Sequence, residues 1–358
     1  MSPTPTSSAD RLILPIQYLR GIAALMVVWF HGMDQVPGLS RYFPFPFGAS
    51  GVDLFFVISG FIMVTTTWKS APTPLEFMRR RVIRIVPLYW LLTLAMVSMA
   101  LCVPNLFRTL VVTPRTLVES LLFIPHFSIS FPFAVWPLLV PGWTLNYEMF
   151  FYLVFACALL LPARMRLTVM AGVLGTLVAI GFALGPFDSA IARVYLNPLL
   201  LEFVIGTGIG AWWSAGRPLA GTGASLVLLV AGFAGLTLRD HPPLGVFTQM
   251  AGAALMVVGA LNSTLARWQC APLRALGDSS YSLYLTHLFA LGVLRVIWGR
   301  FLPPIESWWN AAAFQAAGLV TASVAGWLTF RFVETPMLRW LNRRTGARRQ
   351  ADAVAAMR

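Results

Sequence analysis

Apolar runs of about 20 residues recur along the whole 358-residue chain. A helix of that length spans the ~30 Å hydrocarbon core of a bilayer, because each residue adds ~1.5 Å. Only 11% of the residues are charged, whereas a soluble domain carries about 25% charged residues. The mean hydropathy of +0.75 agrees with this difference. The sequence therefore predicts an all-α, polytopic bundle of transmembrane helices.

We predict about ten spans, with residues 1–345 forming the transmembrane domain and residues 346–358 a basic cytoplasmic tail. No small-residue cleavage site follows the first apolar run, so we expect it to stay as a span. The predicted spans cover residues 14–33, 50–67, 83–103, 142–161, 167–187, 195–214, 222–238, 244–261, 279–299 and 310–331.

The formal charge of +13 comes from 26 basic and 13 acidic residues. In a soluble protein this excess would indicate nucleic acid as a partner. Here most of the basic residues fall in alternate loops and in the tails, so the positive-inside rule predicts that both termini are cytoplasmic. We therefore expect membrane lipids as partners and no nucleic acid. The three cysteines have no metal-binding spacing, so we expect no metal site.

The longest predicted connection, residues 104–141, is rich in proline and aromatic residues. It is too apolar for a free loop. We interpret it as a re-entrant or interfacial lid on the outer side of the membrane.

Ionisable side chains inside spans are costly and are therefore candidates for function. Arg20 and His31 are eleven residues apart, which places them on one helix face and ~16 Å apart. We expect His287 to lie at a depth similar to that of His31. Asp53 and Glu148 follow the outer starts of their helices, so we expect both in the outer half of the membrane.

Two further patterns indicate binding and packing. Arg80, Arg81 and Arg84 lie at helical spacing and either flank the membrane or bind a polyanion such as nucleotide phosphates. Gly206 and Gly210 form a small-xxx-small pair, which predicts close packing of two helices. We expect Glu202, on that same helix, to be structural.

Six motifs, in this order, resemble those of the acyltransferase-3 family of integral membrane proteins, and the resemblance covers almost the whole chain. The subtype most similar to this chain modifies exopolysaccharides. The motifs are Arg20-x10-His31, "GVDLFFVISGF", "RRRVIRIVPLYW", "WTLNYEMFFY", "SYSLYLTH" and the closing "FVETP".

The resemblance implies an O-acyltransferase of the bacterial cytoplasmic (inner) membrane. Its donor would be a cytoplasmic acyl-CoA, and we expect acetyl-CoA. No group would be bound permanently. The acceptor would be a hydroxyl of a polysaccharide or of a lipid-linked oligosaccharide.

On these grounds we assign roles to the motif residues. His31, as base or as acyl-carrying nucleophile, and Asp53, which would orient it, are the predicted catalytic residues. The predicted donor-binding residues are Arg20, Arg80, Arg81, Arg84, Ser59 and Glu334. The predicted acceptor-binding residues are Glu148, Trp143 and His287.

Three other functions stay open at this stage. Intramembrane histidines and carboxylates also form proton relays, so the chain could be a proton-coupled transporter. It could also be a non-catalytic partner of a polysaccharide export machine. Finally, it could acylate a lipid or a peptide instead of a glycan.

Overall fold

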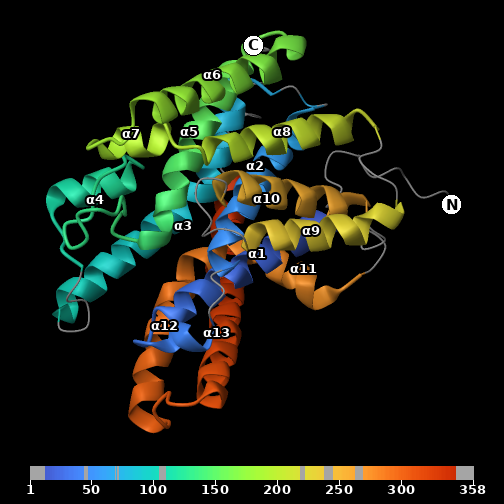
Figure 1. The fold of residues 1–358 in the computed structure, drawn as a ribbon. Coiled ribbons are helices and arrows are strands. Elements are labelled where there is room, and N and C mark those ends of the chain that lie inside the picture. The colour runs from blue at the N-terminus through green and yellow to red at the C-terminus, as the bar shows by residue number, and fades with distance from the viewer. Residues whose placement is uncertain are drawn as a thin grey trace.

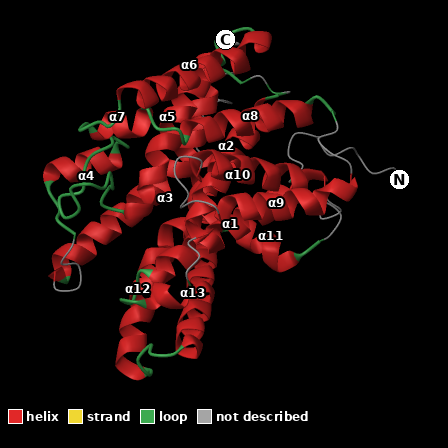
Figure 2. Ribbon diagram, viewed as in Figure 1, coloured by secondary structure: helices red, strands yellow, loops and turns green. Residues whose placement is uncertain are grey.

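The computed structural model describes residues 13–43, 47–68, 70, 72–104, 110–217, 222–237, 245–262 and 269–343. In these ranges every element of regular structure is a helix (Figure 2). The predicted all-α class is therefore confirmed. The predicted tail, residues 346–358, lies outside the described residues.

Thirteen α-helices are described in these ranges, together with short 3-10 turns. Their bounds are α1 (Leu14–Met33), α2 (Gly51–Thr67), α3 (Pro74–Cys102), α4 (Pro114–Leu121), α5 (Trp143–Ala158), α6 (Ala163–Leu184), α7 (Ala190–Tyr195), α8 (Leu200–Ser214), α9 (Ser225–Thr237), α10 (Gly245–Asn262), α11 (Ala271–Asp278), α12 (Ser280–Phe301) and α13 (Trp308–Thr329). A π-helical turn, η8 (Phe330–Glu334), extends α13.

Each of the ten predicted spans contains an observed helix, but fewer helices are long enough to cross a membrane. Within the described residues, eight segments are long and apolar enough to span, with α7 and α8 together forming one of them (Ala190–Ser214). The helices α5 and α9 fall short, with 16 and 13 residues. The chain is thus a multi-pass membrane protein. Which side each terminus faces stays a prediction.

Local sequence signals explain where two helices differ from expectation. The helix α3 begins at Pro74 instead of residue 83, because Thr73 and Glu76 form a reciprocal capping box at its start. This extension makes the arginine-rich segment helical. In the predicted span 195–214 the long helix α8 begins only at Leu200, after a break from α7 that contains Pro198.

The connection predicted as a lid is packed against the helices over its described part. It contains the short helix α4, whose C-terminal end is bound to α3. The hydroxyl of Tyr89 donates to the backbone oxygen of Ser120 (3.1 Å), and the indole of Trp90 donates to that of Leu121 (2.8 Å). The segment is therefore no free loop.

The helices α2 and α8 pack closely against each other in the upper part of the view in Figure 1. A Cβ atom on Gly60 would lie 2.2 Å from the backbone oxygen of Phe203, and one on Gly206 would lie 2.0 Å from that of Val57. Only glycine permits this approach. The packing role predicted for Gly206 and Gly210 is confirmed, since a Cβ on Gly210 would also meet Phe61 at 2.9 Å.

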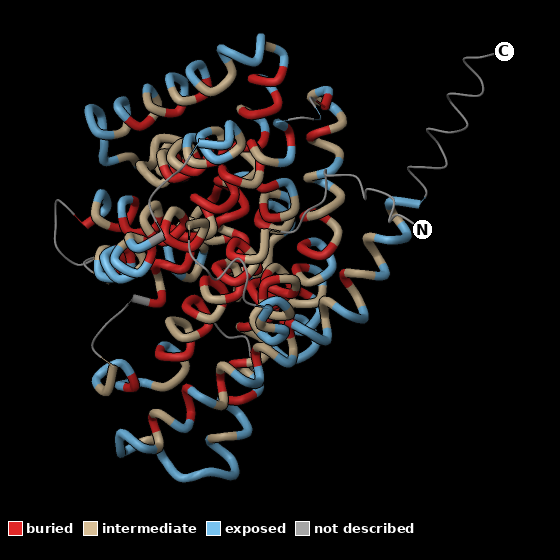
Figure 3. The backbone as a smooth tube through the Cα atoms, turned by 90° about the vertical axis from the view of Figure 1, so that its right-hand side faces the viewer, coloured by how far each residue is buried: buried red, intermediate tan, exposed pale blue. Residues whose placement is uncertain are grey.

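Other helices also pack in pairs. The helices α12 and α13 form an antiparallel hairpin that packs against α1 and whose far end extends beyond the other helices, and α9 pairs with α10 (Figure 1). Buried residues concentrate in the middle of the molecule, while the end of the α12–α13 hairpin is exposed (Figure 3). Many exposed residues on the outer helix faces are large and apolar, as lipid contact requires.

Candidate active site

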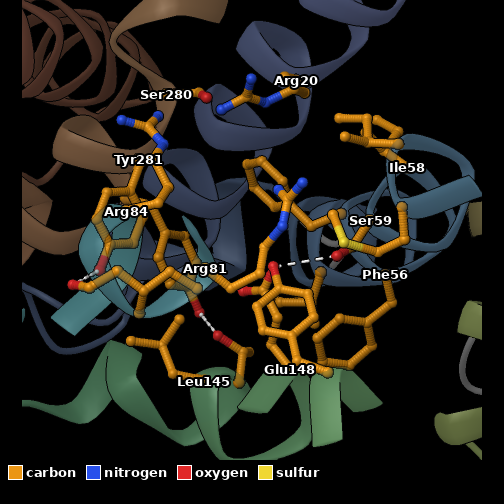
Figure 4. Close-up of a pocket in the computed structure, with 18 residues that line it drawn as sticks. Arg20, Phe56, Ile58, Ser59, Arg81, Arg84, Leu145, Glu148, Ser280 and Tyr281 are labelled. Carbon is orange, nitrogen blue, oxygen red and sulfur yellow. Dashed lines mark hydrogen bonds between the residues drawn. The ribbon is translucent and has the colours of Figure 1, made fainter. Parts of the chain in front are cut away.

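A cavity of about 170 Å³ lies among α1, α2, α3, α5 and α12. Its charged lining residues are Arg20 from α1, Arg81 and Arg84 from α3, and Glu148 from α5 (Figure 4). We call it the arginine cavity. Segments from both ends of the chain meet here, which sequence separation alone does not reveal.

The three guanidinium groups differ in how they are held. Arg20 donates to the side-chain oxygen of Gln17 (3.3 Å), and Arg81 donates to the hydroxyl of Thr66 (3.4 Å). Nε of Arg81 is buried and has no hydrogen-bond partner among the described residues. The hydroxyl of Ser280 lines the same cavity and also has no hydrogen-bond partner among the described residues. Donors of this kind suit an anionic ligand.

Arg84 is held by a buried carboxylate. Its guanidinium donates to Glu334, which is fully buried and also accepts from the hydroxyl of Ser282. Glu334 ends the π-helical turn that follows α13. The sequence predicted Glu334 as a donor-binding residue, and the structure pairs it with one of the predicted donor-binding arginines. Glu334 itself does not line the cavity but positions a residue that does.

Arg80, expected to bind the same anion, lies elsewhere. Its side chain is exposed on α3, and it is absent from the lining of the arginine cavity. A one-residue step on a helix turns a side chain by ~100°, which separates Arg80 from Arg81. Helical spacing alone could not say which of these faces the bundle interior.

The arginine cavity extends along its helices toward the two histidines. On α5 the cavity is lined by Thr144, Glu148 and Tyr152, which are one helical turn apart, and by Leu145. Tyr152 lies near Arg81, whose guanidinium carbon is 5.9 Å from the ring centroid. At the other end, Thr144 lies 2.9 Å from the hydroxyl of Tyr284. The backbone oxygen of Tyr284 contacts His287.

The two histidines are in direct contact. Nε2 of His287 lies 3.3 Å from Nδ1 of His31, so the prediction of a similar depth is confirmed. Nδ1 of His287 lies 2.6 Å from the backbone oxygen of Tyr284, and Nδ1 of His31 lies 3.0 Å from that of Val27. A ring nitrogen beside a carbonyl oxygen carries the proton. Nε2 of neutral His31 is then left as the basic atom.

The histidine pair does not itself line the cavity. Phe55 and Tyr284, with ring centroids 5.7 Å apart, line the cavity, and Tyr284 lies between it and His287. Asp53 is buried on α2. The contacts of the His31 ring described above come from Val27 and His287, so the orienting role of Asp53 stays a prediction.

Glu148 lies beside the predicted donor-binding arginines. Its carboxylate lines the arginine cavity, where it accepts from the hydroxyls of Ser59 (3.0 Å) and Tyr152. Its expected depth in the outer half of the membrane stays a prediction. The i, i+4 series Thr144, Glu148 and Tyr152 faces α2 and α3, which explains this position. A role in acceptor binding stays a prediction.

The remaining expected residues are also found, along with several that were missed. Ser59 lines the arginine cavity, whereas Trp143 lines a separate hollow at the start of α5. Sequence reasoning missed the hydroxyl-bearing residues of the wall because they are uncharged. Helical spacing from the charged residues of the quoted motifs could have indicated that they share the same faces. They are Thr144, Tyr152, Ser280, Tyr281 and Tyr284.

The chain is similar to several known proteins. The model of the acyltransferase-3 family, described as an acyltransferase domain, matches residues 14–331. The chain is 40% identical over 300 residues to the exopolysaccharide production protein ExoZ of Rhizobium meliloti (strain 1021), covering 82% of this chain and 91% of that protein. It is 27% identical over 369 residues to the acyltransferase MdmB of Streptomyces mycarofaciens, covering 91% and 92%. No solved structure matches.

Proposed function

Since this chain belongs to the acyltransferase-3 family, and is thus a multi-pass membrane acyltransferase, we propose that it transfers an acetyl group from acetyl-CoA to a polysaccharide hydroxyl. The observation that carries this proposal is the arginine cavity, which leads from three guanidinium groups toward the histidine pair. The similarity to an exopolysaccharide production protein supports the acceptor class.

The donor-binding part of the proposal rests on charge and shape. Arg20, Arg81 and Arg84 would bind the CoA phosphates, because guanidinium groups bind phosphate bidentately. The N-terminal turn of α12, through Ser280, adds the positive end of a helix dipole. The acyl-carrying arm would then extend along Ser59 and Thr144 toward Tyr284. Acyl-CoA would enter from the cytoplasmic side.

The proposed chemistry uses the free nitrogen of His31. Nε2 of His31 takes the proton from the acceptor hydroxyl, and the resulting oxygen attacks the thioester carbonyl carbon. The carbon–sulfur bond breaks, CoA leaves as a thiolate, and the thiolate takes up the proton. Val27 and His287 would hold the imidazole in the required tautomer. Removal of such a base lowers the rate by about 10²–10⁴-fold.

The proposal is tested by following the acetyl group. Purified protein in proteoliposomes is supplied with acetyl-labelled CoA and with exopolysaccharide from a strain of the source bacterium that lacks this gene. We expect label in the polymer as an alkali-labile ester, and its loss in His31→Ala. Arg339→Ala, an exposed change near the end of the chain, is the control. Label found only in lipid or peptide would contradict the polysaccharide acceptor.

A further inference from the structure

A second hollow, of about 250 Å³, lies at the start of α5. Trp143 and Tyr147 are one helical turn apart and line this hollow, whereas Thr144 and Glu148 line the arginine cavity. The first turns of α5 therefore separate two cavities. Arg81 lies near Tyr152, further along α5, so the hollow and the phosphate-binding end of the cavity lie toward different ends of this helix.

The walls of this hollow are aromatic. They are formed by Trp136, Trp143 and Tyr147, and the rings of Trp143 and Tyr147 meet edge to face with centroids 5.8 Å apart. Flat amphipathic rings of this kind offer apolar contact together with polar edges. The C–H faces of a pyranose ring fit such walls. A site of this composition with few polar groups is typical of small-ligand recognition.

Arg193 brings a positive charge into the hollow. Nε of Arg193 donates to the backbone oxygen of Phe187 (2.6 Å), and Nη1 donates to that of Phe133 (3.3 Å). The guanidinium carbon also lies 4.9 Å from the ring centroid of Phe127. Two of its five N–H groups are thus used to fix its orientation, which leaves three as donors.

No carboxylate is paired with this charge within the described residues, where the ion pairs involve other arginines or His126. Asn197, at the same hollow, accepts from the backbone N–H of Leu199 (3.0 Å), which leaves its NH₂ group as a further donor. An oriented, half-buried guanidinium without an acidic partner suits a carboxylate ligand.

We propose that this hollow is an acceptor subsite for a carboxylate-bearing sugar unit, with Arg193 binding the carboxylate and the aromatic walls packing on the ring. The proposal rests on the proposed function and narrows its substrate to an acidic polysaccharide. The position supports it, because Thr144, beside Trp143, contacts Tyr284, whose backbone oxygen contacts His287. The hollow and the histidine pair are therefore separated by the first turns of α5.

The test compares one polymer in two charge states. Exopolysaccharide from the gene-deletion strain is used as isolated and after chemical reduction of its carboxylates to alcohols. Transfer from labelled acetyl-CoA is measured with wild type, Arg193→Gln and Arg193→Lys. Arg295→Gln, an exposed change on α12, is the matched control. Trp143→Ala serves as a second variant if Arg193→Gln does not fold.

We expect the wild-type KM for the native polymer to be at least about tenfold lower than the KM for the reduced polymer. One charge-assisted hydrogen bond accounts for a difference in affinity of this size. Arg193→Gln should remove this difference and leave the KM for acetyl-CoA unchanged, while Arg193→Lys should retain part of it. Trp143→Ala should raise the KM for both polymers.

Two results would overturn the subsite while leaving the proposed function intact. One is an equal KM for both polymers in wild type, and the other is an equal effect of Arg193→Gln on both. A wild-type protein that transfers acetyl to neither polymer would contradict the proposed function itself, and the subsite with it.

Discussion

Nε2 of His287 faces Nδ1 of His31 at 3.3 Å, so two intramembrane histidines from opposite ends of the chain form one pair. The backbone oxygens of Val27 and Tyr284 fix the other ring contacts. This arrangement gives the two residues different tasks. His31 keeps a nitrogen for chemistry, while both described contacts of His287 hold it in place.

The first prediction separates these tasks. His31→Ala should lower kcat by about 10²–10⁴-fold, because the base is lost. His287→Ala should lower kcat less, about tenfold, because the base remains but one contact that orients it is gone. The Kd for acetyl-CoA should stay within about twofold in both variants, as measured by equilibrium binding. A larger loss of kcat in His287→Ala than in His31→Ala would reverse the assignment.

The second prediction concerns two adjacent arginines. Arg81→Ala removes a cavity-lining cation and should weaken acetyl-CoA binding by about tenfold or more. Arg80→Ala should have a smaller effect, since its side chain is exposed and outside the cavity. Titration calorimetry on the two detergent-purified variants compares them directly. Equal losses would show that the phosphates contact the exposed face of α3.

The third prediction tests the α2–α8 contact. Gly206→Ala forces a Cβ into the backbone oxygen of Val57, and overpacking of this kind costs about 1–3 kcal/mol or more. Gly208→Ala is the matched control on the same helix, because no heavy atom lies within 4 Å of the added Cβ. We expect a lower apparent Tm for Gly206→Ala alone. A similar Tm for both variants would argue against this packing.

The fourth prediction concerns the buried carboxylate of Glu334. Glu334→Gln keeps the volume but removes the negative charge that Arg84 and Ser282 contact. We expect the free energy of unfolding to fall by about 1–3 kcal/mol. This loss is smaller than for a fully buried ion pair, because the Arg84 side chain is 32% exposed. Apparent Tm and acetyl-CoA affinity should both fall. An unchanged Tm with unchanged affinity would contradict the positioning role.

Much of the fold could be predicted because one physical rule dominates it. Apolar runs near 20 residues predict helices, and every expected span contains one. Helix ends were less predictable. The start of α3 depends on the cap formed by Thr73 and Glu76, which lies outside the apolar run. The lengths of α5 and α9 depend on how the chain packs, which composition does not encode.

The site could be predicted in part, for a related reason. Helical spacing correctly brought Arg81 and Arg84 to one face and His31 and His287 to one depth. It could not choose between Arg80 and Arg81, because both fit a cationic helix end. The position of Glu148 beside the arginines could not be predicted, because distance from a helix start gives depth only if the helix crosses the membrane at a known level. Its contacts with Ser59 and Tyr152 required the tertiary structure.

The most direct measurement is equilibrium binding of acetyl-CoA to wild type, Arg20→Ala and His31→Ala, with folding checked by apparent Tm. The arginine cavity predicts saturable binding by wild type, a Kd raised by about tenfold or more in Arg20→Ala, and a Kd within about twofold of wild type in His31→Ala. The absence of saturable binding by folded wild-type protein, or equal weakening in both variants, would contradict the assignment of this cavity to the acyl donor.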